Sequence, residues 1–196
     1  TQNGWSIPAD ESPGKVLEIL RAQQASGRVE IFGVTGRREG EFEIAAGCKN
    51  GRWLTWASNG TKTSEGQYVN DQRSGRWTGW DSNGTKSYEW NYAEGRLHGL
   101  WLLWHDNGQL SEVRYLNMGR ENGESATWFE NGQRESQSWH TNGIPCGIWR
   151  WWFSNGCPKY EGVFVEDVKE GLHRSWYPDG NVKGEYTFKK GVPVRI

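Results

Sequence analysis

Glycine and aromatic positions recur along this chain with a fixed period of 24 residues. The first glycines of the period are Gly27, Gly51, Gly75, Gly99, Gly123, Gly147 and Gly171. An aromatic residue follows each by five positions: Phe32, Trp56, Trp80, Trp104, Trp128, Trp152 and Trp176. A second glycine follows by nine positions: Gly36, Gly60, Gly84, Gly108, Gly132, Gly156 and Gly180. Self-similarity at a fixed period marks repeat architectures, so the pattern predicts seven tandem copies of one unit, from residue 27 to about 194.

Each copy also carries the signature of a β-hairpin. The second glycine is preceded by Asn59, Asn83, Asn107, Asn131 and Asn155 in five copies, and by Thr35 and Asp179 in the terminal ones. Asn-Gly between aromatic and β-branched stretches predicts a type I′ turn, because both central residues of that turn need positive φ. The next strand ends in Glu-x-x-aromatic, at Glu65 to Tyr68, Glu89 to Tyr92, Glu112 to Tyr115, Glu161 to Phe164 and Glu185 to Phe188. With a second turn in every period, the sequence predicts an all-β, elongated antiparallel meander of about fourteen short strands.

The turn also predicts a register. If Asn83 and Gly84 form a two-residue loop, Gly75 lies opposite Tyr92, and we expect the glycine to leave room for the facing ring. Trp77 then shares a face with Tyr92, whereas Trp80 points to the other face unless a bulge intervenes. Two alternatives follow: either both faces of the sheet are aromatic, or a bulge at Gly79 turns Trp80 back.

Residues 1–26 break the pattern and form a separate N-terminal segment. Ser12-Pro13 reads as an N-cap followed by proline at the first helical position. Val16, Leu17, Ile19 and Leu20 supply the apolar side of a short helix that we expect to end near Ser26-Gly27. Because the first repeat is aliphatic instead of Trp-rich, the helix is expected to cap that end of the sheet. The predicted organisation is this segment followed by the repeat array over residues 27–196.

Composition and charge exclude several classes of partner. Of 196 residues, 23 are basic and 24 acidic, and these are interleaved, which disfavours nucleic acid and a polyanionic membrane surface. No apolar run approaches the ~20 residues of a membrane-spanning helix. The three cysteines (Cys48, Cys146 and Cys157) are odd in number, and Cys146 and Cys157 fall near opposite ends of one predicted hairpin, which predicts free thiols and hence a cytoplasmic protein. Because the sequence starts at Thr1, we expect that preceding residues were removed, and a periplasmic or secreted location after loss of a signal is the alternative.

The repeat resembles a known family. Gly-x-Trp-x-x-Trp-x-x-Asn-Gly, then Glu-x-x-Tyr and Gly-x-x-His-Gly, best seen from Gly75 to Gly99, resembles a variant MORN repeat. The last copy, from Trp176 to Gly180, is similar to the ordinary MORN consensus. Within that superfamily the Asn-Gly turns resemble those of bacterial YwqK-type antitoxins. The resemblance implies an adaptor protein without catalytic activity, and an antitoxin or immunity protein is one such adaptor. Ser125, His173 and Cys146 depart from the family consensus.

No catalytic, metal or cofactor site is expected. The recurring glutamates of successive copies lie two strands apart, about 9.6 Å, which exceeds the ~5.5 Å of a retaining glycosidase pair. The histidines have no metal-ligand spacing, and no nucleophile and base appear together. The sequence therefore predicts a protein that is not an enzyme.

Aromatic residues beyond the repeat pattern mark a candidate binding face. Exposed Trp and Arg are typical interface anchors. The candidate residues are Trp101, Trp104, Trp128, Phe129, Trp139, Trp149, Arg150, Trp151, Trp152 and Phe153. We expect a protein partner on this face or on an exposed edge strand, and the strand from Val192 to Ile196 predicts a homodimer. The alternative is a ligand-binding module whose aromatic clefts hold cell-wall glycan or quaternary ammonium groups.

Overall fold

The computed structural model describes residues 4–8 and 13–194 of the chain. It divides into two compact units, Thr1–Arg96 (unit 1) and Leu97–Ile196 (unit 2), which are described separately. Unit 1 contains β1 (Gly4–Ile7), α1 (Pro13–Ala22), β2 (Gly27–Phe32), β3 (Arg38–Ala45), β4 (Cys48–Trp56), β5 (Lys62–Val69), β6 (Gln72–Trp80) and β7 (Lys86–Ala93). Unit 2 contains β8 (Arg96–Trp104), β9 (Leu110–Asn117), β10 (Arg120–Trp128), β11 (Arg134–Thr141), β12 (Ile144–Trp152), β13 (Pro158–Val165), β14 (Val168–Trp176), β15 (Val182–Lys189) and β16 (Val192–Val194).

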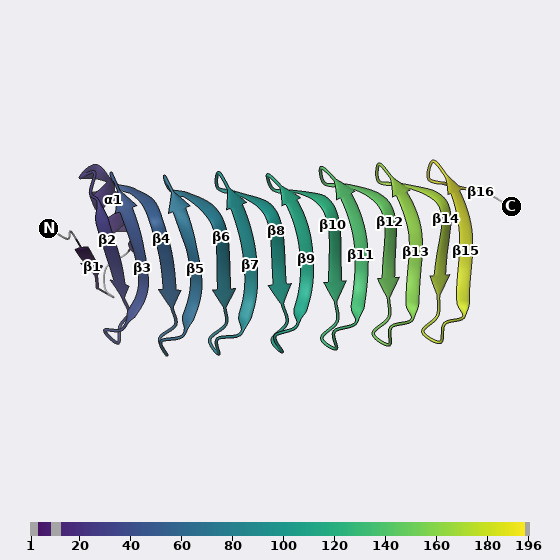
Figure 1. Ribbon diagram of the computed structural model, residues 1–196, viewed down its shortest axis with the longest axis horizontal. Helices are drawn as coiled ribbons and strands as arrows, with labels where there is room; N and C mark the ends of the chain where they lie inside the picture. The colour runs from purple at the N-terminus through teal and green to yellow at the C-terminus, as the bar shows by residue number, and fades with distance from the viewer. Residues whose placement is uncertain (1–3, 9–12, 195–196) are drawn as a thin grey trace. The chain divides into compact units, whose positions relative to one another are not determined.

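Within each unit the strands follow one another in chain order as hairpins (Figure 1). Every described pairing from β2 onward is antiparallel, and β1 pairs in parallel with β2. The predicted all-β meander of 24-residue hairpins, with one short N-terminal helix, is confirmed. The sequence pattern did not predict β1.

The Asn-Gly turn differs from the predicted type I′ turn. The amide of Gly84 donates to the carbonyl of Asp81, and the amide of Asp81 donates to the carbonyl of Thr85. The loop therefore has three residues, Ser82 to Gly84, in which the glycine has φ of +88° and Asn83 does not have positive φ. A three-residue loop that closes on a left-handed glycine is another common hairpin connection. The type I′ prediction was wrong because Asn-Gly suits both turns.

The predicted pairing of Gly75 with Tyr92 is nevertheless confirmed. A three-residue loop moves the strand pairing by one residue relative to a two-residue loop. One extra residue on β7, between the partners of Gly79 and Trp80, restores the predicted pairing. The reason we gave for the glycine was wrong, since a Cβ on Gly75 would meet nothing within 4 Å. Its φ is +63°, and β6 bulges there against β5. Glycine is required for this backbone conformation.

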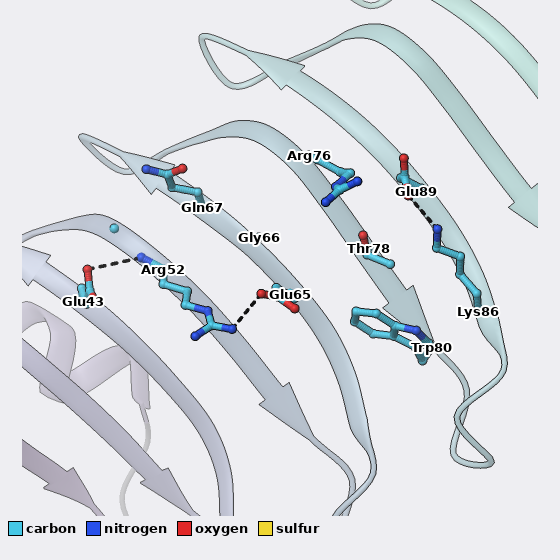
Figure 2. A pocket seen from close by; sticks show the side chains of 11 residues that line it. Glu43, Arg52, Glu65, Gly66, Gln67, Arg76, Thr78, Trp80, Lys86 and Glu89 are labelled. Carbon is cyan, nitrogen blue, oxygen red and sulfur yellow. Dashed lines mark hydrogen bonds and ion pairs between the residues drawn. The ribbon is translucent and has the colours of Figure 1, made fainter.

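Both faces of the sheet are aromatic, so the first alternative is correct and no bulge at Gly79 turns Trp80 back. Trp77 contacts Tyr68 and Tyr92 on one face, which we call the ladder face. Trp80 lies on the opposite face together with Thr78 and Glu89 (Figure 2), and we call this the open face. The bulge falls on the returning strand, so it leaves Trp80 on the open face. The same names are used for the corresponding repeat positions of unit 2.

Hydrogen bonds join successive repeats at both rims of the sheet. At the second turn of each period two residues have positive φ, as at Asn70 and Asp71, and the amide of Asp71 donates to the carbonyl of Lys49. The type I′ geometry therefore occurs at this turn. At the Asn-Gly turn the Asn59 amide group donates to the Ser82 carbonyl of the next copy at 2.9 Å.

The asparagine side chains repeat this bond along the rim. The described bonds join Asn59 to Ser82, Asn107 to Glu130, Asn131 to Ser154 and Asn155 to Pro178. The first and last copies lack the asparagine, and each keeps part of this bonding in another way. In the first copy, Arg37 donates to the Ser58 carbonyl instead. In the last copy, Asp179 keeps the acceptor half of the motif by accepting from the amide of Asn181.

We expect Asn131→Asp to destabilise unit 2 by about 1–2 kcal/mol, because a carboxylate cannot donate to the Ser154 carbonyl. Asn131 also accepts from the amide of Gln133 at 3.0 Å, and aspartate retains that acceptor. Urea unfolding followed at unit 2 amides measures the change. As the matched control, Asp179 bonds within its own turn in the described chain, to Asn181, so Asp179→Asn should change stability by less than about 0.5 kcal/mol. Equal effects of both substitutions would contradict the rim bond.

The N-terminal segment covers the ladder face of the first repeat. Ile7, Leu20, Val29, Phe42 and Ile44 form the buried core, with Trp5, Val16 and Leu17 packed against it. Parallel strands need a crossover, and α1 supplies it between β1 and β2. Ile19 is 50% exposed and does not belong to the predicted apolar side. The predicted N-cap, Ser12, lies outside the described residues.

The helix ends earlier than the predicted Ser26-Gly27. Gln24 has φ of +48°, its amide donates to the Arg21 carbonyl, and the amide of Ala25 donates to the Leu20 carbonyl. This pair of bonds is a Schellman motif, which ends α1 at Ala22. The division into residues 1–26 and 27–196 stays a prediction.

Candidate interaction surface

The ladder face of unit 1 is a continuous column of packed rings. Ring centroids are 5.0 Å apart for Phe42 and Trp53, 5.5 Å for Trp53 and Tyr68, 5.1 Å for Tyr68 and Trp77, and 6.3 Å for Trp77 and Tyr92. Trp77 is 2% exposed, and its indole N–H donates to the carbonyl of Gln67. Because buried aromatic pairs supply most of their energy through packing, this face stabilises the unit.

A histidine takes part in the corresponding column of unit 2. His173 packs between Phe164 and Phe188, with centroids 5.5 and 4.8 Å away, and is 3% exposed. Its Nε2–H donates to the Val163 carbonyl at 3.0 Å, so Nδ1 accepts from the Tyr160 hydroxyl. Burial lowers the pKa of His173 below its usual value, with the nearby Lys169 adding to the effect. The ring is therefore neutral in the folded chain near pH 7.

Unit 2 is expected to lose stability on acidification. The pKa of His173 is lower in the folded chain than in the unfolded chain, so the neutral ring adds to the free energy of unfolding. This contribution is complete above pH 6.5, the unshifted pKa, and is lost as the pH falls from there toward the folded pKa. The substitution His173→Trp introduces the residue that four of the other six copies carry at this position, and it should reduce the slope of unfolding free energy against pH. Chemical denaturation between pH 7.5 and 5 (roughly the range in which histidine titrates) measures it. An unchanged slope in the variant would contradict this role.

The open face of unit 1 is charged and internally paired. Glu41 binds Arg28 and Arg38, at 2.5 and 2.8 Å, and Glu65 binds Arg52 and Lys62, at 2.8 and 2.6 Å. Figure 2 shows the neighbouring part of this face, which forms an open pocket of about 690 Å³. These exposed ion pairs contribute little stability individually, but they keep the surface hydrated.

The open face of unit 2 carries exposed apolar side chains at the positions where unit 1 has arginine and, on the facing strands, glutamate, glutamine or asparagine. They come from successive hairpins and are between 37% and 46% exposed. We call them the apolar row: Leu100, Tyr115, Trp139, Ile148 and Leu172. Strand pairing places Leu100 opposite Tyr115, and Trp139 opposite Glu124. The equivalent positions of unit 1 include Arg28, Glu43 and Arg52.

The ten predicted binding residues are divided between the two faces. Trp101, Trp149 and Trp151 occupy ladder-face positions, where Trp149 packs on Phe164 at 5.2 Å and Trp151 packs on Tyr160 at 5.0 Å. Five occupy open-face positions: Trp104, Trp128, Trp139, Arg150 and Trp152. Phe129 and Phe153 begin the Asn-Gly turns, each donating across its loop. The structure therefore does not bring all ten together; of them, Trp139 belongs to the apolar row.

Sequence reasoning missed Leu100, Tyr115, Ile148 and Leu172. A signal for Tyr115 was present, because Glu112 and Tyr115 follow Gly99 by 13 and 16 residues, one fewer than in the other Glu-x-x-aromatic copies. A one-residue shift exchanges the faces of a strand. Glu112 accordingly pairs with Arg114 and Leu103 on the ladder face, while Tyr115 turns to the open face.

The recurring carboxylates have basic neighbours. Glu89 binds Lys86 at 2.7 Å, Glu161 binds Arg150 at 2.6 Å, and Glu185 pairs with Arg174. Among the described residues no cluster of three or more His, Cys, Asp or Glu could hold a metal ion. The three cysteines are free, as predicted. No helix in the described part of the chain is long and apolar enough to cross a membrane.

Comparison with known proteins identifies the repeat. A family model described as a MORN repeat variant matches residues 97–117 and 169–190, which correspond to β8–β9 and β14–β15 with their turns. No curated protein matches the chain. Repeats of this kind are generally non-catalytic and form scaffolds, often for protein or membrane interactions. The chain therefore carries MORN repeats of the variant type in two of its hairpins, within a scaffold built throughout from hairpins of the same pattern.

Proposed function

We propose that the chain is a non-enzymatic scaffold that binds a protein partner through the open face of unit 2. The observation that carries this proposal is the apolar row, whose exposed side chains follow one another across neighbouring hairpins. Contiguous apolar surface on a soluble domain is typical of protein-binding sites. Tyr115 and Trp139 supply rigid aromatic anchors of the type that dominates interface energies.

The charged face of unit 1 suits this role less well. Glu41 and Glu65 each bind two cations, so a partner that covers these groups must desolvate paired charges. The gain from covering such pairs seldom exceeds that cost. The contrast between the two open faces favours unit 2 as the binding half.

The finer proposal follows the resemblance to antitoxins: the partner is a toxin whose active surface is covered on binding. Homodimerisation through β16 stays a separate prediction. Val192, Pro193 and Val194 are all exposed, so the edge is open to strand addition in the described chain.

The alternative is a module whose aromatic clefts hold cell-wall glycan or quaternary ammonium groups, and its quaternary ammonium form is disfavoured by the chain's own cations. Arg38 lies 4.7 Å from the ring centre of Trp56, Lys62 lies 4.4 Å from that of Trp80, and Arg134 lies 5.2 Å from that of Trp128. A choline headgroup would have to displace these groups to gain the same cation–π energy. We therefore expect millimolar choline to leave the tryptophan fluorescence unchanged; saturable quenching would favour the alternative.

The proposed function is tested by affinity capture from a native lysate with three baits. The first is the wild-type chain, the second carries Leu100→Ser and Ile148→Ser, and the third carries Arg28→Gln and Arg52→Gln on the open face of unit 1. A protein captured by the first and third baits but lost from the second supports the proposal. A protein that is still captured by the bait with the apolar-row substitutions contradicts the proposal. A protein that is lost only from the bait with the arginine substitutions contradicts it as well.

A further inference from the structure

We propose that the open face of unit 1 binds a small acidic sugar, with Arg76 as the residue that takes its carboxylate. The site is the pocket of about 690 Å³ shown in Figure 2, to which β3, β4, β5, β6 and β7 all contribute side chains. This volume falls within the ~300–1,000 Å³ of small-molecule sites. The site shares no residue with the apolar row and does not depend on a protein partner.

Arg76 differs from the arginines at the same position of the two preceding copies. Arg28 binds Glu41, and Arg52 binds Glu65. In the copy of Arg76 the corresponding carboxylate, Glu89, bonds to Lys86 at 2.7 Å. Within the described part of the chain Arg76 has no ion-pair or hydrogen-bond partner, although it lines the pocket. Its guanidinium is therefore available for a bidentate bond to a carboxylate.

The rest of the lining selects against more highly charged anions. Three carboxylates line the pocket with Arg76: Glu43, Glu65 and Glu89. Hydrogen bonds from Lys62 and Arg52 lower the pKa of Glu65, so this group stays ionised and can only accept hydrogen bonds. Their negative charge repels doubly charged phosphate and sulfate groups more strongly than a single carboxylate, and their oxygens match sugar hydroxyls. A ligand with one carboxylate and several hydroxyls satisfies both kinds of group.

Two uncharged features complete the match. Gln67 projects from β5 beside Gly66 and offers an amide that both donates and accepts (Figure 2). Trp80 lines the end of the pocket near Lys86, and the part of its ring that the Lys62 ammonium does not cover, 4.4 Å from the ring centre, supplies apolar surface for the C–H groups of a pyranose ring. The lining therefore combines the Arg76 guanidinium with carboxylate acceptors, an amide and an indole, while its other two cations, Arg52 and Lys86, bond to Glu65 and Glu89.

The test is a titration of the 196-residue chain with D-glucuronate, followed by the indole N–H resonance of Trp80 in ¹⁵N-correlated NMR spectra at constant ionic strength. D-Glucose serves as the matched ring without a carboxylate, and acetate as the carboxylate without a ring. We expect saturable shifts with glucuronate in the millimolar range, and binding of glucose and acetate at least about tenfold weaker. No saturable shift, or equal affinity for either control compound, overturns the proposal.

The variant Arg76→Gln should weaken glucuronate binding at least about tenfold, the equivalent of about 1.4 kcal/mol. Arg76 is exposed, so this substitution leaves the fold intact. Arg28→Gln is the matched control, because Arg28 holds the same repeat position but lies outside the pocket. Unchanged affinity in Arg76→Gln, or an equal loss in Arg28→Gln, would refute the assignment.

Discussion

Trp77→Ala is expected to lower the unfolding temperature of unit 1 substantially. Trp77 is almost completely buried, contacts Tyr68 and Tyr92, and lies over Gly66, where a Cβ would come within 2.1 Å of its ring. Removing a buried tryptophan side chain costs about 3–5 kcal/mol, which is a large part of the stability of a domain of this size. The expected fall in the unfolding midpoint of unit 1 is at least about 12 °C.

Because the two units need not unfold together, the measurement must report on each. Hydrogen exchange of backbone amides in β5 and β6 follows unit 1, and amides in β13 and β14 follow unit 2. Trp139→Ala is the matched control, since Trp139 is 40% exposed and should lose less than about 1 kcal/mol. If Trp77→Ala and Trp139→Ala lost the same amount of stability, the packing of the ladder face would not be the main source of stability.

The second large effect concerns binding. Once a partner has been captured, Trp139→Ser should weaken its affinity at least about 30-fold, because central aromatic anchors contribute ~2 kcal/mol or more. The loss should appear mainly as faster dissociation. Surface plasmon resonance with the purified partner measures both rates.

The control for this effect is Trp56→Ser. Trp56 lies at an open-face position of unit 1 beneath the guanidinium of Arg38, so it offers the same side chain outside the apolar row. We expect unchanged partner affinity in this variant. A partner that tolerates Trp139→Ser but not Trp56→Ser would place the binding surface on unit 1.

The repeat was predictable because two glycines and an aromatic residue recur at the same spacing in every copy. The pairing of Gly75 with Tyr92 followed from the same count, even though the loop is one residue longer than expected, because the bulge on the returning strand compensates. The role of Asn59 could not be read in this way. Its side chain bonds to the next copy, 23 residues away, and pair preferences within one turn carry no information about that contact.

The binding surface was less predictable than the fold. Counting aromatic residues selected Trp149 and Trp151, which pack within the ladder face, and passed over Leu100 and Ile148, which are exposed. Composition cannot distinguish a ring in the core from a ring on the surface. The face of each residue depends on the strand register, which a single insertion or bulge changes.

Oxidative footprinting of the chain with and without its partner tests the location of the binding surface most directly. The proposed role predicts that Tyr115 and Trp139 become protected together, while Trp56 and Trp80 keep the labelling rates of the free chain. Protection of Trp56 and Trp80 with Trp139 still freely labelled would contradict it.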